Sequence, residues 1–287
     1  MMSTNTIHNS TPRLTKIIRP PAASLQSVLA GLAGLAHYRD LLYTLSVHRV
    51  KVRYKQSLLG FGWAVLQPLS LMLIYTLVFS YIARVPSDGM PYAVFAYSAL
   101  LPWSYFANAL TSATTGLVSH AHLVTKVYFP REILPLTYVI AALFDLLIAS
   151  VVLAGLMVYY RVSLTVNALY ALPIILLLTC FVTAVSLVLS AVQVRFRDVG
   201  MAMPLLLQLW MFATPVVYPL SAVPKRFQTL YTLNPMVGVI ESFRRAVLQG
   251  TTPDFRSLAV ASVVTILILP LAYIYFKRVE ATAADTI

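Results

Sequence analysis

The run from Leu58 to Ala83, which contains no charged side chain, constrains this sequence more than any other feature. As a helix it would be about 39 Å long at 1.5 Å per residue, which exceeds the roughly 30 Å of bilayer hydrocarbon. Directly before it stand four alternating basic residues, Arg49, Lys51, Arg53 and Lys55, which we call the basic collar. Because cytoplasmic flanks of spans carry an excess of Lys and Arg, we expect this end to lie in the cytoplasm.

Composition supports a polytopic membrane protein. Hydrophobic residues make up 59% of the chain and charged residues 10%, and the mean hydropathy is +0.80. Soluble domains carry about 25% charged residues. The net charge of +12 is explained by span flanks and anionic lipid rather than by nucleic acid. We therefore expect membrane lipids, and no nucleic acid, among the partners.

The apolar pattern predicts an all-α polytopic membrane protein with six transmembrane helices. The predicted spans are about 58–83, 92–115 (broken by Pro102), 133–160, 169–194, 200–220 and 257–276. With the N-terminus inside, fourteen of the 21 Lys and Arg residues fall on inside segments. This bias predicts that both termini are cytoplasmic. The six spans together predict one membrane domain over residues 58–278.

The flanking segments have their own patterns. Residues 1–36 predict a mobile cytoplasmic tail. We expect residues 279–287 to form a cytoplasmic tail at the other end. Residues 37–57 predict an amphipathic helix in the membrane interface, although the alternating collar would also suit a strand. The apolar face of this helix consists of Tyr38, Leu41, Leu42, Leu45 and Val52.

The outside segment 221–255 is rich in proline, but residues 236–248 read as a mostly apolar helix. It is too short to span, so we predict re-entrant helices between spans five and six. Glu241 and Arg245 are spaced to form an i,i+4 ion pair on this helix.

Several kinds of chemistry have no motif here. The sequence lacks the glycine-rich phosphate loop, a spaced set of metal ligands and a recognisable nucleophile–base pair. We therefore predict no catalytic residue, no metal and no cofactor in this chain. Cys180 is read as a small apolar residue.

Asp145 is the one acid well inside a predicted span. An intramembrane carboxylate can act as a proton relay or gate. It can also be a structural acid facing the bundle interior, for which Ser150 and Asn108 are conceivable partners. We favour the structural interpretation.

The connection between spans two and three, residues 119–135, is too long for a simple turn. Residues 123–129 could form a short helix that docks in the groove of another protein, and an ordinary amphipathic loop helix is the alternative. Pro130 can start the following helix, with Glu132 in its first turn.

Five segments in order give the chain a resemblance to a known family. The segments are residues 54–68, 129–135, 195–199, 214–219, and 233–236 with 241–245. They resemble the permease subunits of bacterial polysaccharide exporters of the type-2 ABC class, which export O-antigen, capsule or teichoic acid. The resemblance covers about residues 38–278. It implies a homodimer in the bacterial cytoplasmic (inner) membrane, paired with two copies of a separate ATPase that binds ATP and Mg²⁺.

The resemblance also implies roles for particular residues. The ATPase would be contacted by Lys126, Val127, Tyr128, Phe129, Pro130, Arg131 and Glu132. Arg195, Arg197 and Asp198 would brace the cytoplasmic ends of the spans.

The substrate implied is a polyprenyl-diphosphate-linked glycan. Its diphosphate suits the basic collar, for which anionic phospholipid is the alternative partner. Sugars stack on aromatic rings, and the candidates in the first two spans are Trp63, Tyr75, Phe79, Tyr97, Trp103, Tyr105 and Phe106. Lipid contact is the alternative role of these aromatic residues. Two other functions stay open: an ABC exporter of drugs or lipids, and an ion-coupled carrier that uses Asp145.

Overall fold

The structure, a computed structural model, describes residues 37–55, 57–122 and 129–286. These residues form helices and loops, with no strand among them. In chain order the elements are α2 (Arg39–Tyr54), α3 (Gly62–Tyr75), η1 (Thr76–Ile82), α4 (Tyr92–Ser119), α6 (Ile133–Tyr159), η2 (Val166–Tyr170), α7 (Ala171–Arg195), α8 (Asp198–Phe212), η3 (Leu220–Ala222), α9 (Lys225–Thr232), α10 (Pro235–Val247) and α11 (Phe255–Thr286). The predicted N-terminal tail lies outside the described residues.

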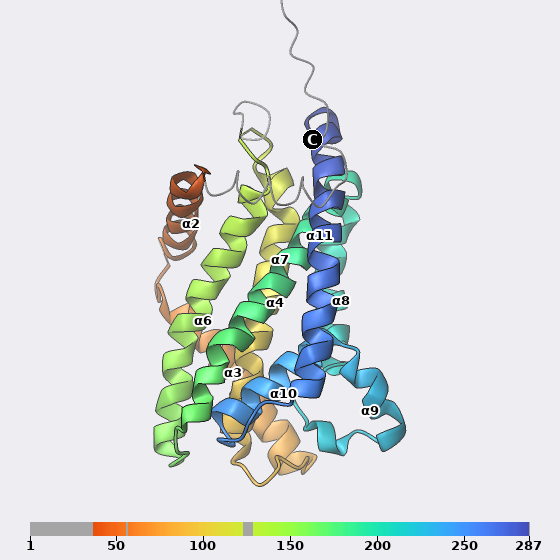
Figure 1. The fold of residues 1–287 in the computed structure, drawn as a ribbon. Helices are drawn as coiled ribbons and strands as arrows, with labels where there is room; N and C mark the ends of the chain where they lie inside the picture. The colour runs from red at the N-terminus through yellow and green to blue at the C-terminus, as the bar shows by residue number, and fades with distance from the viewer. Residues whose placement is uncertain (1–36, 56, 123–128, 287) are drawn as a thin grey trace, which may run out of the picture.

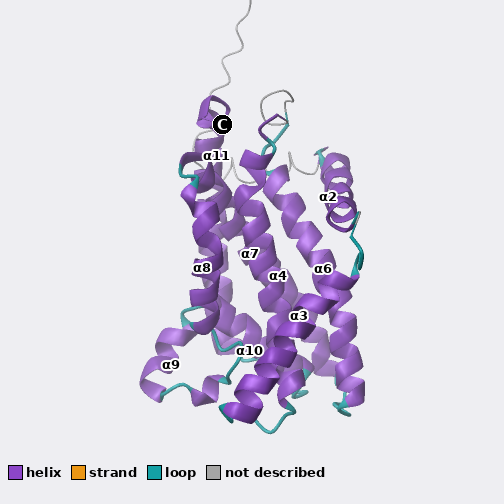
Figure 2. Ribbon diagram, turned by 180° about the vertical axis from the view of Figure 1, so that it is seen from behind, coloured by secondary structure: helices purple, strands orange, loops and turns teal. Residues whose placement is uncertain are grey.

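The bundle is built around α4. This helix contacts α3, α6, α7, α8 and α10, and all of its residues from Tyr92 to Trp103 are buried. The long helices α4, α6, α7 and α11 run along the length of the molecule, and α9 and α10 lie at the end away from the C-terminus (Figure 1). Seen from behind, α3 lies in front of the lower half of the bundle (Figure 2).

Four described stretches are long and apolar enough to cross a membrane: Gly62–Ile82, Ile133–Tyr159, Val166–Arg195 and Phe255–Glu280. They coincide with predicted spans one, three, four and six. At the positions of spans two and five lie α4, with its many small and polar residues, and the shorter apolar helix α8. The first stretch is 11% buried within the chain, against 28–39% for the other three. Most of its surface therefore faces lipid or another molecule.

The predicted break at Pro102 is wrong. Helix α4 runs without interruption through this proline, which is buried among its neighbours. A proline frees a carbonyl of the preceding turn, and packing against neighbouring helices makes that loss tolerable in a membrane. Pro68 lies inside α3 in the same way.

The predicted N-terminal helix forms, as α2 beside the upper half of α6 in both ribbon views (Figures 1 and 2). Tyr38, Leu41, Leu42 and Leu45 pack against the buried cluster at the end of the bundle where α6 begins and α7 ends. Val52 is 55% exposed. The predicted apolar face is thus confirmed without Val52, because the last turn of α2 directs Arg53 rather than Val52 toward α6.

An Asn–Pro step explains where α10 begins. Pro235 occupies the first turn, where its missing N–H is not needed, and the Asn234 side chain accepts from the Met236 amide at 3.1 Å. Asn234 also receives the Trp210 indole N–H at 3.2 Å and donates to the Thr214 hydroxyl at 2.9 Å. The amide thus joins the start of α10 to the end of α8.

The predicted pair Glu241–Arg245 is wrong in its second member. Arg244 is the residue that reaches Glu241, at 3.5 Å. Arg244 is fully buried on the inward face of α10, where it also donates to two carbonyls after α8 and lies 3.8 Å from the ring centre of Phe95. Arg244 pairs with Glu241 because it lies on the buried face of α10, whereas Arg245 lies on a more exposed side of this helix.

Close packing of α10 on α11 depends on Gly238. A Cβ at this position would meet the carbonyl oxygen of Ser257 at 2.4 Å, and backbone cannot yield as a flexible side chain can. Gly155 on α6 has open space around it. We predict that Gly238→Ala lowers the free energy of unfolding by about 1–3 kcal/mol, as overpacking does.

The check is the thermal unfolding midpoint of the purified protein. Gly155→Ala is the matched control and should leave the midpoint unchanged or raise it, because alanine is the better helix former. Equal midpoints for both variants would show that the α10–α11 contact can relax.

Candidate functional site

The basic collar separates into two inward arginines and two outward lysines. Residues four apart share a face of a helix. Arg49 and Arg53 contact residues of α6 and of the end of α4, whereas Lys51 and Lys55 are exposed. The lysines are thus free to meet anionic headgroups, whereas the guanidinium groups of the two partly accessible arginines bind partners on α6 and at the end of α4.

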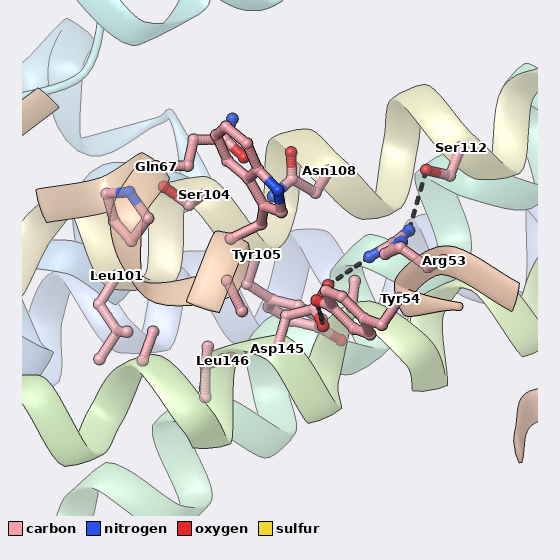
Figure 3. A pocket seen from close by; sticks show the side chains of 15 residues that line it. Arg53, Tyr54, Gln67, Leu101, Ser104, Tyr105, Asn108, Ser112, Asp145 and Leu146 are labelled. Carbon is pink, nitrogen blue, oxygen red and sulfur yellow. Dashed lines mark hydrogen bonds and ion pairs between the residues drawn. The ribbon is translucent and has the colours of Figure 1, made fainter. Parts of the chain in front are cut away.

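Arg53 forms an ion pair with Asp145 inside the bundle (Figure 3). Its Nη1 donates to Asp145 Oδ2, and the hydroxyl of Tyr54 donates to Oδ1 at 2.5 Å. The second guanidinium nitrogen, Nη2, reaches Ser112 Oγ at 3.4 Å. The Asp145 side chain is 12% exposed and that of Arg53 30%. The pair lies about three turns into α6, counting 3.6 residues per turn.

The partners of Asp145 differ from the two conceivable partners named from the sequence, Ser150 and Asn108. Ser150 donates instead to the carbonyl of Leu146, and Asn108 lines the adjoining cavity. The partners come from α2, 91 and 92 residues away in sequence. Asp145 therefore fixes the end of α2 against α6.

Arg49 makes the second inward contact. Its Nη1 lies 2.8 Å from Nε2 of His120, and its guanidinium lies 4.2 Å from the ring centre of Tyr138. Since arginine can only donate, Nε2 must accept, which places the imidazole proton on Nδ1, 2.9 Å from the carbonyl of Gly116. This geometry requires neutral His120, and burial lowers the pKa of its imidazole.

Between α2, α3, α4 and α6 lies a cavity of about 310 Å³ (Figure 3). It combines the Arg53–Asp145 pair with hydroxyl, amide and aromatic side chains. Its lining consists of Arg53, Tyr54, Trp63, Ala64, Gln67, Pro68, Leu101, Ser104, Tyr105, Asn108, Ser112, Ala142, Asp145, Leu146 and Ala149. A guanidinium suits a phosphate or carboxylate, amides and hydroxyls suit a polyhydroxylated molecule, and aromatic faces suit the apolar side of a sugar.

Two of the predicted aromatic residues line this cavity. Trp63 stands at its edge and is 51% exposed, and Tyr105 lies deeper and donates to Thr179 at 3.1 Å. Tyr75 and Phe79 are half-buried neighbours near the other end of α3 and η1, with ring centres 5.8 Å apart. Trp63 and Tyr105 thus lie in the same cavity as Arg53, and Tyr75 and Phe79 do not.

The remaining predicted aromatic residues lie in the core of α4. Tyr97 is fully buried and donates to the carbonyl of Ala149 at 3.0 Å. Trp103 contacts Phe106, and Phe106 stacks on Phe181 with ring centres 5.9 Å apart. In this arrangement these three predicted residues support the bundle and do not line the cavity.

The described part of the predicted ATPase contact begins at Phe129, because Lys126, Val127 and Tyr128 lie outside the described residues. The buried carboxylate of Glu132 accepts from Lys277 at 2.7 Å and from the hydroxyl of Tyr273 at 3.2 Å. The Arg131 guanidinium donates to the carbonyl of Glu280 at 2.6 Å. The start of α6 is thus tied to the last described turns of α11, with Pro130 half-buried beside it.

At the turn between α7 and α8, the side chains of Arg195, Arg197 and Asp198 are exposed. The Gln193 amide spans the turn instead, donating to the carbonyl of Arg197 at 3.0 Å and accepting from Gly200 N at 2.6 Å. The predicted bracing role of the three charged residues remains a prediction.

The sequence interpretation missed several polar residues of the cavity, namely Tyr54, Gln67, Ser104 and Ser112. A signal was present in the second span, where Ser104, Asn108 and Ser112 recur every four residues and so share one face of α4. Polar residues on one stripe of a spanning helix face the protein interior or an aqueous cavity. The described residues contain no group of three or more His, Cys, Asp or Glu that could hold a metal.

We predict that α2 is held less firmly in acid. The docked state binds the neutral form of His120 and lowers its pKa below the usual value of about 6.5. The contribution of this contact is therefore complete above pH 6.5 and declines as the pH falls from there toward the lowered pKa. The unfolding midpoint of wild type should fall over this window.

His120→Gln should remove this pH dependence, since its amide oxygen still accepts from Arg49 without titrating. His37→Gln is the matched control, because this exposed histidine lies just before α2. A wild-type pH dependence that persists in His120→Gln would contradict the assignment.

Residues 40–248 match the family described as ABC-2 type transporter. The chain is 31% identical over 255 residues to the O-antigen export system permease protein RfbA of Myxococcus xanthus, covering 88% of this chain and 97% of the relative. It is 27% identical over 219 residues to a protein of the same name from Klebsiella pneumoniae, covering 76% and 84%. The polysialic acid transport protein KpsM of Escherichia coli is 25% identical over 258 residues, covering 87% and 97%.

Proposed function

Because the chain belongs to the ABC-2 type transporter family, we propose that it is the membrane-spanning subunit of an ATP-driven polysaccharide exporter. The observation that carries this proposal is the similarity to O-antigen export permeases along almost their whole length. The substrate we propose is an O-antigen-like glycan on a polyprenyl diphosphate, moved across the bacterial inner membrane. The chain itself performs no covalent chemistry.

The proposed topology has six spans, formed by α3 with η1, α4, α6, η2 with α7, α8 and α11. Helix α2 lies at the cytoplasmic side, both termini are cytoplasmic, and α9 and α10 are re-entrant from the outer side. The position of α10 supports this: its end of the bundle is opposite the C-terminus, and its inward face is buried (Figure 1). Fourteen cytoplasmic Lys and Arg residues agree with this orientation.

We propose that two copies of the chain pair with two copies of an ABC ATPase, which binds ATP and Mg²⁺. The low burial of the η1 half of the first span, where Leu77, Tyr81 and Ile82 are 60%, 74% and 72% exposed, supports a second copy as the neighbour of that half. The ATPase would contact residues 126–132. The ties from Glu132 and Arg131 to α11 supply a mechanical route, because any displacement of this segment is passed to both α6 and α11.

The test is reconstitution in lipid vesicles with the cognate ATPase. We expect a polyprenyl-diphosphate-linked glycan to cross the membrane only when both ATP and the ATPase are present. Protection of the glycan from an added glycosidase gives the readout. Transport by the chain alone without ATP would contradict the proposal and favour a carrier, whereas transport of drugs but not glycan would move the assignment to another ABC cargo.

The contacts from Glu132 and Arg131 to α11 predict a variant in which ATP hydrolysis is uncoupled from glycan export. Glu132→Gln keeps an acceptor for Tyr273 but removes the charge that holds Lys277 against α6, and leaves Lys277 only its pair with Glu280 on its own helix. We expect ATP hydrolysis by the complex to continue while the glycan exported per ATP falls severalfold, because breaking a buried pair weakens the link between α6 and α11.

Arg278→Gln is the matched control, since this neighbour of Lys277 on α11 is exposed. It should export like wild type. Equal coupling in Glu132→Gln and wild type would show that the buried pair transmits no movement.

A further inference from the structure

We propose that Asp145 is a built-in counter-ion, which holds Arg53 while the cavity is empty and yields it to a phosphate of the lipid-linked sugar when the cavity fills. This inference rests on the proposed function and specifies its binding site. It assigns Arg53 to direct phosphate binding, Asp145 to competition with that phosphate, and Tyr54 to holding Asp145 after the exchange.

Arg53 has donors left for an incoming anion. A guanidinium can grip a carboxylate or a phosphate with two parallel N–H bonds. Here Asp145 receives Nη1 through one oxygen, and among the residues that the structure describes Nη2 reaches only Ser112, at a long 3.4 Å. The fork is therefore not closed by its present partner. A diphosphate carries more negative charge and more acceptor oxygens than one carboxylate, so it competes well for the same donors.

Asp145 keeps a partner when Arg53 leaves. A buried carboxylate without a partner is very unfavourable, and this cost would normally prevent an exchange. The Tyr54 hydroxyl, 2.5 Å from the other carboxylate oxygen, remains as a charge-assisted hydrogen bond (Figure 3). Arg53, whose side chain is 30% exposed, can turn toward the cavity at little cost. Arg53 and Tyr54, at the end of α2, thus give Asp145 two bonded states. In one state Asp145 binds both residues, and in the other it binds Tyr54 alone.

The rest of the cavity suits the first sugar. Its volume of about 310 Å³ is at the lower end for small-molecule sites, about 300–1,000 Å³, which fits a phosphate with one sugar rather than a polymer. Ser104, Asn108 and Gln67 offer hydrogen bonds, and Trp63 and Tyr105 offer ring faces. Of these groups, Gln67, Ser104 and Asn108 lie on α3 and α4, across the cavity from Asp145 (Figure 3).

The lipid tail would remain in the bilayer beside α3. Trp63 is 51% exposed at the edge of the cavity, and Leu66 and Leu73 on the same helix are 41% and 63% exposed. This places an apolar surface next to the opening of a charged pocket. An amphiphile with a phosphorylated head and a long apolar tail matches both parts at once.

The experiment titrates the purified full-length chain in neutral detergent with a polyprenyl diphosphate that carries one sugar, and counts bound lipid by native mass spectrometry. We expect Arg53→Gln to bind about tenfold more weakly, since it loses a charge-assisted contact. Asp145→Asn should bind severalfold more tightly, because the competing charge is gone while its amide oxygen still accepts from Tyr54. Arg39→Gln is the matched control and should bind like wild type, because this arginine lies at the other end of α2 and its side chain is 83% exposed.

Arg53→Gln should weaken lipid binding and Asp145→Asn should strengthen it. These opposite changes in affinity distinguish direct phosphate binding from a purely structural role of the pair. If the pair served only to hold α2, both variants would weaken binding together, and that result overturns the inference. Arg53→Lys keeps the charge but loses the fork, and its binding should lie between wild type and Arg53→Gln. This variant tests the inference even if Arg53→Gln fails to fold.

Two further lipids identify the ligand. Polyprenol without phosphate should not bind. Phosphatidylglycerol should bind more weakly than the sugar diphosphate, and equal affinity with the same variant pattern would make this an ordinary phospholipid site and overturn the inference. The assay needs neither ATPase nor export. Failure of glycan export alongside the expected binding pattern would therefore count against the proposed function alone.

Discussion

A charge inside an apolar bundle must find its partner within the protein, because the surrounding hydrocarbon offers no water. The Arg53–Asp145 pair satisfies this constraint by joining α2 to the middle of α6. The pair fixes the last turn of α2 against α6. It forms one side of the cavity that Trp63 and Tyr105 also line.

The same constraint organises both ends of the bundle. At one end, the fully buried Arg244 gathers Glu241, two carbonyls after α8 and the ring of Phe95. At the other end, Glu132 gathers Lys277 and Tyr273. Each cluster joins helices that are distant in sequence. The central pair differs because its arginine side chain is 30% exposed, against 1% for Arg244 and 20% for Lys277, and because it lies beside a cavity. This position suits exchange rather than permanent attachment.

Sequence patterns predicted the features that depend on local periodicity. The helices at the six predicted positions, the amphipathic α2 and the apolar helix α10 all follow from spacing. The collar could be recognised as basic, and its four-residue spacing already placed Arg49 with Arg53. Its division into bound arginines and exposed lysines depends on Asp145 and His120, which are far away in the chain.

The aromatic residues show why the site itself was harder to predict. Tyr97, Trp103 and Phe106 look the same in sequence as Trp63 and Tyr105, since all lie in apolar spans. Which of them line the cavity is decided by the rotation of α4 against α6 and α7. Likewise, the partner of Glu241 was misassigned because i,i+3 and i,i+4 spacings are equally reachable, and the buried face of α10 makes the choice.

The most direct measurement is a structure of this chain, with its ATPase held inactive, bound to a polyprenyl diphosphate carrying one sugar. The account predicts a phosphate oxygen about 3 Å from the guanidinium of Arg53. Asp145 should then be bonded to Tyr54 and not to Arg53, with the sugar against Trp63 and Tyr105. A lipid bound elsewhere, with the Arg53–Asp145 pair intact, would contradict it.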